Sequence, residues 1–509
     1  MKTFYGKTVA LIIPPSPFLL DERVFVSLGI LRVASALEQV GVKIDMLDLS
    51  GVENYLEAIE AYINTNNPDW FGLTSTTPQL PSAVKIAAVL KRLSPDTKVV
   101  LGGPHVTLSY SAQKIEAKSQ SYEGRATIAV KVLESYFDIL IAGDGEYAAL
   151  KVFDKDCPKV VDGDDNRGPY FLTNASYEAL PQPARHLVDM GSYRYSIDEF
   201  PATSLIAQLG CPFHCGFCGG RNSKSLRLVR TRSTTSIIQE MRWLYEEYGY
   251  TGFMFYDDEL NISKSFVDLM NSIVNLQAEL GVEFRLRGFI KAELFTEKQA
   301  SAMFRAGFRW LLCGFESANE TILSNIEKIA TLEDNTRAVQ IAKKNGLKIK
   351  ALMSVGHPGE NENSILQIRD WLVQMEIDDF DCTIITTYPG TPYYDLAIKD
   401  PDYENVWTYT HKKSGDRLHA YALDFTITPD YYKGDPAGGY KSYVFTDYLS
   451  AEGIVMLRDT VEREVRSKLE IPFHNSKAAI RFEHSMGQGL NAQILRNSTE
   501  AREKVGIKE

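Results

Sequence analysis

The sequence is poor in cysteine, in long apolar runs and in positive charge. Only six cysteines occur in 509 residues, far fewer than a secreted disulfide scaffold carries, so we expect a reducing, cytoplasmic compartment. No window approaches ~18 uninterrupted apolar residues, which predicts that no segment spans a membrane. The formal net charge of −11 argues against a general nucleic-acid binder, because phosphate contacts need clustered Lys and Arg.

A dinucleotide-binding fingerprint is also absent, because no G-x-G-x-x-G follows the first apolar run. Residues 1–155 nevertheless alternate apolar strands with helical patterns. Continuous apolar strands separated by helices predict a doubly wound, Rossmann-like α/β domain whose parallel sheet is covered on both faces. Its strands are predicted at residues 7–14, 42–49, 68–75, 97–103 and 137–143.

Loops rich in Gly, Pro, Ser and Thr follow four of these strands. Ligands of doubly wound sheets bind beyond the carboxyl ends of the strands. These residue types also let the backbone approach a ligand closely. We therefore predict a binding edge formed by residues 14–17, 74–79, 101–107 and 142–146.

A second series of strands and helices begins near residue 201, after an irregular linker predicted at 156–200. Six strand–helix units predict a parallel (β/α)6 barrel, a partial TIM barrel, over residues 201–395. Residues 396–509 are expected to form a small, α-rich accessory domain with a polar tail after about residue 475. The barrel strands are expected at 203–209, 251–257, 282–289, 308–315, 348–356 and 380–386.

Three of the six cysteines lie in one loop, LGCPFHCGFCGG at residues 209–220, directly after the first barrel strand. The spacing C-x3-C-x2-C admits three interpretations. An iron–sulfur cluster with three cysteine ligands keeps one iron open for a substrate. Zinc would need a fourth ligand such as His214, and no second cysteine knuckle is present. Inert thiols are the third interpretation, and the compact, glycine-flanked loop favours the cluster.

Four further motifs resemble those of the radical S-adenosylmethionine enzymes and occur in the same order. They are FMFYDDEL at 253–260, WLLCGFESANETIL at 310–323, LMSVGHPGEN at 352–361 and TTYPGTPYY at 386–394. The resemblance implies a [4Fe–4S] cluster whose open iron binds S-adenosylmethionine, cleaved to a 5′-deoxyadenosyl radical after one-electron reduction. It implies an external reductant of the flavodoxin or ferredoxin type. It also implies three iron ligands, which are Cys211, Cys215 and Cys218.

The same resemblance implies an S-adenosylmethionine site at the carboxyl ends of the barrel strands. The acidic residues at 257–259 would accept hydrogen bonds from the amino group, and Arg285 or Arg287 would pair with the carboxylate. The residues after the fourth strand would bind the ribose, and the turn at 356–359 would lie near the adenine. The implied site residues are Phe217, Asp257, Asp258, Glu259, Arg287, Glu316, Ser317, Gly356 and Pro358.

The first 200 residues resemble the cobalamin-binding subfamily of these enzymes. LGGPHVTL at 101–108, GDGEYA at 143–148 and LPQPARHLVDM at 180–190 carry this likeness. It implies a corrinoid that lies over the carboxyl edge of the sheet with its cobalt facing the barrel. The implied contacts are Pro15, Ser75, Thr76, Thr77, Gly102, Gly103, Pro104, His105, Val106, Gly143, Asp144, Gly145 and Glu146.

The chain differs from cobalamin domains that ligate cobalt through a histidine, and the difference concerns the lower ligand of the cobalt. Those domains carry Asp-x-His-x-x-Gly after the first strand, whereas this chain reads PPSPFLLDERVF at 14–25. We therefore expect no protein imidazole below the cobalt. His105 is the alternative lower ligand, although a polar loop residue is the simpler interpretation.

The resemblance implies a cobalamin-dependent methyltransferase that moves a methyl group from methylcobalamin to an unactivated carbon of a small molecule, through a 5′-deoxyadenosyl radical. A cobalamin-dependent cyclase or rearrangement enzyme without net methyl transfer remains the alternative. A methylthiotransferase would hold a second cluster through three more cysteines, whereas Cys157, Cys313 and Cys382 are scattered. A non-catalytic sensor of corrinoid or redox state is the interpretation from a different class.

Overall fold

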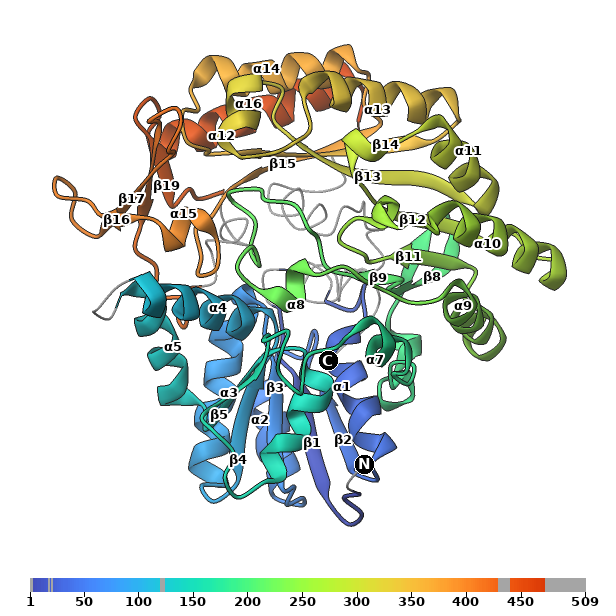
Figure 1. The fold of residues 1–509 in the computed structure, drawn as a ribbon, viewed down its shortest axis with the longest axis vertical. Helices are drawn as coiled ribbons and strands as arrows, with labels where there is room; N and C mark the ends of the chain where they lie inside the picture. Colours follow the sequence, from blue (N-terminus) through green and yellow to red (C-terminus); the bar gives the residue numbers. More distant parts are fainter. Residues whose placement is uncertain (1–2, 17–18, 20–21, 120–123, 429–439, 472–509) are drawn as a thin grey trace.

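The computed structural model describes residues 3–16, 19, 22–119, 124–428 and 440–471. Two parallel sheets dominate it, and Figure 1 shows the sheet of the first 163 residues at the bottom and the curved second sheet above it. None of the helices described is both long and apolar enough to cross a bilayer. The polar tail expected after about residue 475 lies outside the described residues.

The amino-terminal sheet has six parallel strands in the order β2-β1-β3-β4-β5-β6, which confirms the doubly wound prediction. Because β1 lies between β2 and β3, the strand order reverses there, and ligands of such sheets bind outside the strand ends at this switch point. The strands are β1 (Thr8–Ile13), β2 (Lys43–Asp48), β3 (Trp70–Thr74), β4 (Lys98–Gly102), β5 (Ile139–Gly143) and β6 (Val160–Gly163).

Helices cover both faces of this sheet, since its strands are apolar on both sides. Ile12 and Phe71 face the core shared with α2, α3 and α5. Leu11 and Trp70 point the other way, into the core shared with α1 and residues 148–152. The helices are α1 (Leu28–Gln39), α2 (Tyr55–Ile63), α3 (Leu80–Leu93), α4 (Pro104–Ser119), α5 (Arg125–Tyr136) and α6 (Gly145–Ala148).

Residues 156–200 are more regular than the sequence predicts. The strand β6 pairs with β5 in parallel and extends the first sheet. A short helix, α7 (Asn174–Glu178), follows, and β7 (Tyr195–Ile197) pairs antiparallel with β8 of the second sheet. The expectation of an irregular linker is therefore wrong for these three elements, each of five residues or fewer and too short to show a periodic pattern.

The second sheet is an open half-barrel in the order β15-β14-β13-β12-β11-β8-β7. Its six strands from β8 to β15 run parallel, which confirms the predicted (β/α)6 unit. Its inner strand faces line the barrel, and the outer faces pack against helices. The strands are β8 (Phe200–Leu205), β11 (Gly252–Phe255), β12 (Arg285–Ile290), β13 (Phe308–Glu316), β14 (Lys348–Val355) and β15 (Asp379–Ile384).

The outer helices of the half-barrel follow its strands in sequence (Figure 1). They are α9 (Thr234–Tyr248), α10 (Phe266–Leu280), α11 (Glu297–Ala306), α12 (Glu320–Asn325), α13 (Leu332–Lys344) and α14 (Glu362–Gln374). Short elements occupy the loops at the carboxyl ends of the strands: β9 (Gln208–Leu209), α8 (Lys224–Arg227), β10 (Arg230–Thr231) and α15 (Pro392–Asp395).

The carboxy-terminal region differs from the α-rich domain expected from the sequence. Its described part holds one long helix, α16 (Ala451–Lys468), which packs against α14 and β15. The rest forms a four-stranded antiparallel sheet. Its strands are too short to show a clear alternation of apolar and polar residues in the sequence. These strands are β16 (Ile398–Lys399), β17 (Val406–Thr410), β18 (Arg417–Tyr421) and β19 (Val444–Thr446).

Candidate active site

The carboxyl ends of the two parallel sheets face a common space, and Figure 1 shows the loop that carries α8 between them. A cavity of about 390 Å³ occupies this region. Gly102 and Gly143 line it from the amino-terminal sheet, and Gly210 and Asp258 line it from the barrel loops. Its volume lies within the ~300–1,000 Å³ that cofactor sites commonly have.

The cavity exists because side chains become smaller toward the ends of β3 and β4. Trp70 and Val100 are followed, on the same face of the sheet, by Gly72 and Gly102. A Cβ atom on Gly102 would meet no atom closer than 3.8 Å, so the glycine leaves open space. Apolar side chains such as Leu11 and Ile141 and charged side chains such as Asp144 and Arg230 line the cavity together, which suits a cofactor that has both apolar and polar groups.

Seven of the predicted corrinoid contacts line this cavity, and they follow β4 and β5: Gly102, Gly103, Pro104, Gly143, Asp144, Gly145 and Glu146. The glycine at 103 has φ of +98°, and a Cβ there would lie 2.8 Å from the Ser75 backbone nitrogen. No other residue fits this close approach of two loops without a shift.

The other six predicted contacts lie at the same edge but not in the cavity wall: Pro15, Ser75, Thr76, Thr77, His105 and Val106. Val106 is fully buried in the core. The His105 ring hydrogen-bonds Thr77 Oγ1 at 3.0 Å and packs against Phe425. Burial lowers the pKa of His105 to about 4, so this ring is a neutral, internally bonded group.

The cysteine loop is held by backbone hydrogen bonds to the barrel. The Cys211 N–H donates to the Leu226 carbonyl at 3.0 Å, and the Gly216 N–H donates to the Ile326 carbonyl at 2.6 Å. All three cysteines are free thiols. Among the described residues, no group of three or more His, Cys, Asp or Glu is placed to share a single metal ion.

Two buried lysines that the sequence did not single out flank this loop. Lys328 Nζ lies 3.6 Å from Glu316 Oε1, and Lys291 Nζ lies 4.2 Å from the centre of the Phe213 ring. Burial raises the pKa of Cys215, and both lysines lower it in part. They therefore favour the thiolate form that iron binds, and their cationic surroundings fit an iron–sulfur cluster.

The three acidic residues at 257–259, directly after β11, have different surroundings. The Asp257 carboxylate accepts from the Ala207 N–H at 3.1 Å and the Gln208 N–H at 2.6 Å, so it holds the loop after β8. Asp258 is exposed and lines the cavity. Glu259 Oε2 is buried without a hydrogen-bond partner in the described structure, and burial raises its pKa to about 7.

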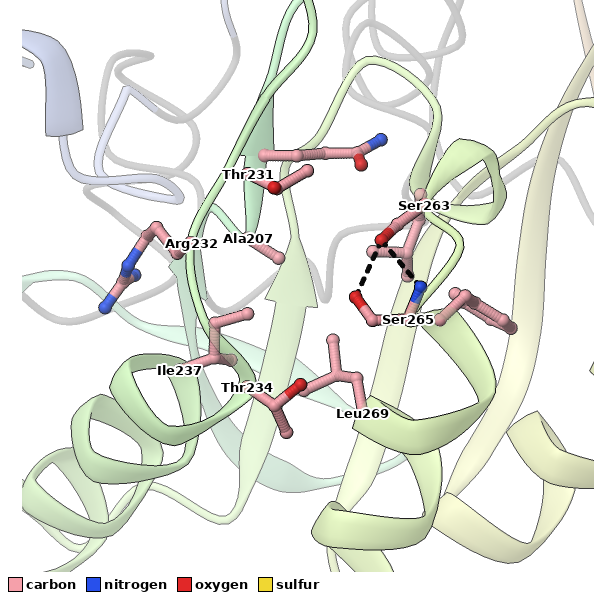
Figure 2. A pocket seen from close by; sticks show the side chains of 11 residues that line it. Ala207, Thr231, Arg232, Thr234, Ile237, Ser263, Ser265 and Leu269 are labelled. Atoms are coloured by element: carbon pink, nitrogen blue, oxygen red, sulfur yellow. Dashed lines mark hydrogen bonds between the residues drawn. The ribbon is translucent and has the colours of Figure 1, made fainter. Parts of the chain in front are cut away.

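A small hollow adjoins Gln208 between α9, α10 and the end of β8 (Figure 2). Figure 2 shows Ser263 and Ser265 hydrogen-bonded to each other at one side of it. Its volume is only about 10 Å³, which is room for no more than one water molecule. It is therefore not a second cofactor site.

A chain of polar groups links the ends of β13 and β14. The Ser354 hydroxyl donates to Glu316 Oε2 at 2.8 Å and is 2.8 Å from His357 Nε2. Since the hydroxyl has one proton, Nε2 must donate to it, which leaves Nδ1 as an acceptor. Ser317 is fully buried, and its hydroxyl accepts from the Asn319 N–H.

The turn after β14 lies against the cysteine loop. The His357 ring lies 5.3 Å from the Phe217 ring, centre to centre. Glu360 holds the turn, because one of its oxygens accepts from the N–H groups of both Gly356 and His357. The Pro358 carbonyl accepts from Asn325. The structure thus places Phe217 against the turn that contains Gly356 and Pro358.

Arg287 lies apart from this group. It is in the middle of β12, in register with Met254 of β11 and Trp310 of β13, whereas the other residues follow the strand ends. Its guanidinium lies 5.9 Å from the Trp310 ring, inside the barrel. Arg285 is nearer still to the start of the strand and pairs with Glu283 at 2.7 Å. Lys291, which directly follows β12, is instead the cation at the carboxyl end of this strand, where the other predicted site residues lie.

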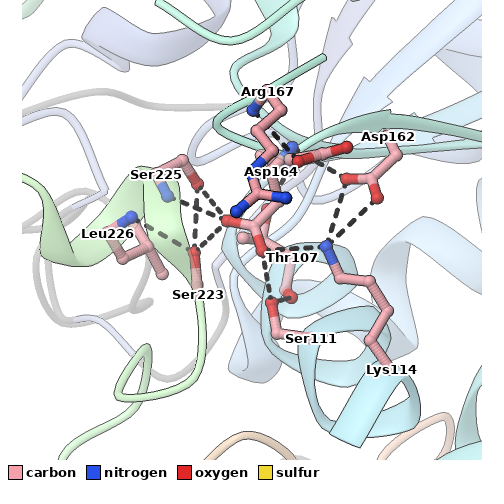
Figure 3. A network of polar contacts seen from close by, with 11 residues as sticks. Thr107, Ser111, Lys114, Asp162, Asp164, Arg167, Ser223, Ser225 and Leu226 are labelled. Atoms are coloured by element: carbon pink, nitrogen blue, oxygen red, sulfur yellow. Dashed lines mark hydrogen bonds and ion pairs between the residues drawn. The ribbon is translucent and has the colours of Figure 1, made fainter. Parts of the chain in front are cut away.

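A buried carboxylate that sequence reasoning missed joins the two halves of the site. Asp164, directly after β6, accepts from the Ser223 hydroxyl at 2.5 Å and from the Ser225 hydroxyl and N–H at 2.8 and 2.9 Å (Figure 3). Its other oxygen accepts from Ser111 and Lys114 at 3.1 and 3.2 Å. The segment directly after the cysteines is thus tied to the amino-terminal sheet.

Two family models match the chain in the order of its two sheets. The B12 binding domain matches residues 22–130, and the radical SAM superfamily matches residues 205–372. The chain is 28% identical over 397 residues to an uncharacterized methyltransferase of Pyrococcus horikoshii, covering 77% of this chain and 83% of that protein. It is 26% identical over 349 residues to the anaerobic magnesium-protoporphyrin IX monomethyl ester cyclase of Rubrivivax gelatinosus, covering 64% and 59%.

Solved structures share this architecture. The radical S-adenosylmethionine methyltransferase TsrM from Kitasatospora setae, with cobalamin and a [4Fe–4S] cluster bound, has a TM-score of 0.61 at 18% identity and covers 81% of each chain. The cobalamin-dependent radical enzyme OxsB has a TM-score of 0.54 at 16% identity, covering 74% of this chain and 53% of its own. The chain therefore belongs to the cobalamin-binding radical S-adenosylmethionine enzymes, and its cofactors are a [4Fe–4S] cluster, S-adenosylmethionine and cobalamin.

Proposed function

We propose that this enzyme is a C-methyltransferase that acts on an unactivated carbon of a small molecule. The observation that carries the proposal is the shared cavity, which is lined both by the ends of β4 and β5 and by Gly210 and Asp258 beside the cysteine loop. A methyl donor and a hydrogen-abstracting radical have to reach one substrate, so their sites must open into one space. The methyltransferase of Pyrococcus horikoshii is a relative over most of both chains.

We assign the three iron ligands to Cys211, Cys215 and Cys218. The backbone bonds of Cys211 and Gly216 fix the loop, and Lys291 and Lys328 compensate the negative charge of the thiolates. Together, the cofactors supply a methyl group on cobalt and a carbon-centred radical derived from S-adenosylmethionine. The protein residues orient the cofactors and substrate and exclude water from the radical.

For S-adenosylmethionine, the geometry supports a revised set of roles. Asp258 and Glu259 accept hydrogen bonds from the amino group, because Asp257 is already occupied by two backbone N–H groups. Lys328 takes the place of Arg287 as the partner of the carboxylate, since it lies at the rim beside Glu316. Glu316 and Ser317 lie where the ribose is expected, and Phe217, Gly356 and Pro358 border the adenine.

For the corrinoid, the contacts that line the cavity are the best supported, from Gly102 to Pro104 and from Gly143 to Glu146. No histidine occurs among the described residues that line the cavity. We therefore keep the proposal that no imidazole of this chain ligates the cobalt. The proposed domains are residues 1–155 for cobalamin, 156–200 as connection, 201–395 for the barrel and 396–509 as an accessory region.

A cyclase or rearrangement enzyme is the second candidate, and the cyclase of Rubrivivax gelatinosus supports it through 26% identity over 349 residues. In both cases the enzyme needs an external one-electron reductant of the flavodoxin or ferredoxin type and a small-molecule substrate. The scarcity of cysteine supports a cytoplasmic location for it.

Anaerobic turnover with candidate substrates separates the two functions. Methyl transfer produces S-adenosylhomocysteine and 5′-deoxyadenosine together, and the product gains a methyl group from labelled S-adenosylmethionine. Formation of 5′-deoxyadenosine and a changed product without S-adenosylhomocysteine would contradict the methyltransferase proposal. Protein from which cobalamin is omitted is the control, because it should form neither the methylated product nor the rearranged one.

A further inference from the structure

Arg32 is a buried cation in the wall of the cofactor cavity. It lies on α1, is only 5% exposed and lines the cavity together with Gly29 and Val33 of the same helix. Its Nε atom is buried and has no partner among the described residues. A buried guanidinium nitrogen without a hydrogen-bond partner is costly, so a ligand that accepts a hydrogen bond from it would be stabilised at this position.

The neighbours of Arg32 do not supply that group. The two nearby carboxylates are Glu146 and Glu240, and neither forms an ion pair with Arg32 in the part of the chain that the structure describes. Glu240 is already bonded to Arg185 and Arg232. On one side the guanidinium packs over the Tyr177 ring at 5.0 Å, which positions it without neutralising it.

The other arginine of the cavity shows the contrast. Arg230 is similarly buried, and its Nε atom also lacks a partner among the described residues. Its other guanidinium nitrogens, however, pair with Asp144 at 2.5 Å and donate to the carbonyls of Leu172 and Ser225. Its charge is therefore balanced within the protein. Among the cavity-lining residues, Arg32 is the arginine whose charge points to a ligand.

We infer that Arg32 binds the phosphodiester of the nucleotide tail of cobalamin. This inference rests on cobalamin being the ligand of the cavity. The peripheral side chains of the corrin ring are neutral amides, and the phosphodiester is the anionic group of the tail. The apolar side chains of Leu11, Trp70 and Ile141 line the same cavity, so water competes poorly for the anion. A guanidinium donates two parallel hydrogen bonds to a phosphate, which lysine does not.

The consequence is selectivity among corrinoids. A cobinamide, which lacks the phosphate and the base, would leave Arg32 buried and unsatisfied, whereas complete cobalamin would not. Cobinamide phosphate restores the anion without the base. The enzyme should therefore bind cobalamin and cobinamide phosphate more tightly than cobinamide, and Arg32 should account for the difference.

The test is the dissociation constant of each of these three corrinoids for full-length apoprotein, measured by equilibrium dialysis. Arg32→Gln should weaken binding of cobalamin and cobinamide phosphate by ~10- to 100-fold and leave cobinamide within about twofold. Arg32→Lys should restore part of the loss. Arg92→Gln is the matched control, because it removes the charge of an exposed arginine that pairs with Glu60. This variant should bind all three corrinoids like the wild type.

Three results would overturn the inference. If Arg32→Gln lost the same affinity for all three corrinoids, Arg32 would contact the corrin amides and not the phosphodiester. If it lost affinity for none of them, Arg32 would not contact the corrinoid. Equal wild-type affinity for cobinamide and cobinamide phosphate would also contradict it, and this comparison does not depend on the folding of a variant. If the wild type binds none of the corrinoids, the cofactor assignment itself fails, which is a different outcome.

Discussion

The Asp144 carboxylate and the Arg230 guanidinium lie 2.5 Å apart and are both more than nine-tenths buried. Asp144 follows β5 of the amino-terminal sheet, and Arg230 begins β10 in the loop that follows the cysteines. The same carboxylate accepts from the Leu172 N–H at 2.7 Å. This ion pair therefore fixes the distance between the two halves of the cofactor cavity.

Asp144→Ala should destabilise the apoprotein by ~3–5 kcal/mol, because it leaves the Arg230 charge buried and unpaired. The measurement is chemical denaturation at neutral pH. In Asp144→Ala/Arg230→Met no unpaired charge remains, so the double variant should be more stable than Asp144→Ala alone. Losses that simply add in the double variant would show that the two side chains do not interact.

Cys215→Ala should abolish the cluster and leave the cobalamin cavity intact, because this cysteine does not line the cavity. Anaerobically reconstituted wild type should hold about four irons and one cobalt per chain. The variant should lose nearly all iron and all 5′-deoxyadenosine formation while its cobalt content stays within about twofold of the wild type. Cys157→Ala, at a distant half-buried thiol, is the matched control and should keep both metals.

Lys328→Met should weaken S-adenosylmethionine binding by ~10-fold, since it removes the cation beside Glu316 where we place the carboxylate. Equilibrium binding to cluster-loaded protein measures this effect, and iron content confirms that the cluster is present. Lys343→Met, which changes an exposed lysine of α13 that pairs with Glu376, should bind like the wild type. If Lys328→Met binds S-adenosylmethionine with normal affinity, Lys328 is not the partner of its carboxylate, and another cation such as Lys291 would have to be.

Glu360 should make stability depend on pH in a defined direction. Burial raises the pKa of Glu360 to about 7, although the His357 and Gly356 N–H groups lower it in part. Between about 4.5, the usual value, and about 7, the folded state then holds a proton that the unfolded state has lost. The free energy of unfolding therefore falls as pH rises through this window, by up to ~3 kcal/mol in total.

Glu360→Gln isolates this contribution, because the amide oxygen still accepts the two N–H groups but does not ionise. The wild type should lose stability relative to this variant between pH 4.5 and 7, measured by denaturation at each pH. A difference between the two proteins that stays constant over this range would contradict the raised pKa.

Local patterns in the sequence predicted much of the site. The cysteine spacing predicted three iron ligands because all three cysteines lie within eight residues of one loop. The motifs at strand ends located Asp258, Glu316 and Gly356, since parallel strands place their carboxyl ends along one edge whatever the details of packing. Arg287 was predicted to contact S-adenosylmethionine, and the structure places it in the middle of β12 and not at its end, because alternation along a strand indicates the face of a residue but not its depth along the barrel.

Other residues had no local pattern to reveal them. Lys328 lies between α12 and α13 and reads as an ordinary polar residue until the fold places it beside Glu316. Arg32 sits in an amphipathic helix where an arginine is expected to face solvent, and only the cavity shows that it does not. Asp164 gains its role from Ser223 and Ser225, about sixty residues further along the chain.

The sequence by itself determined the two parallel α/β units, their order and the cysteine loop, because apolar periodicity and short motifs act over a few neighbouring residues. Only the tertiary structure decided that the two strand edges face one cavity, that Asp144 and Arg230 hold them together, and that the Arg32 Nε atom has no hydrogen-bond partner among the described residues. The physical reason is that burial and charge balance depend on residues far apart in sequence. A buried charge becomes informative only when its surroundings are known.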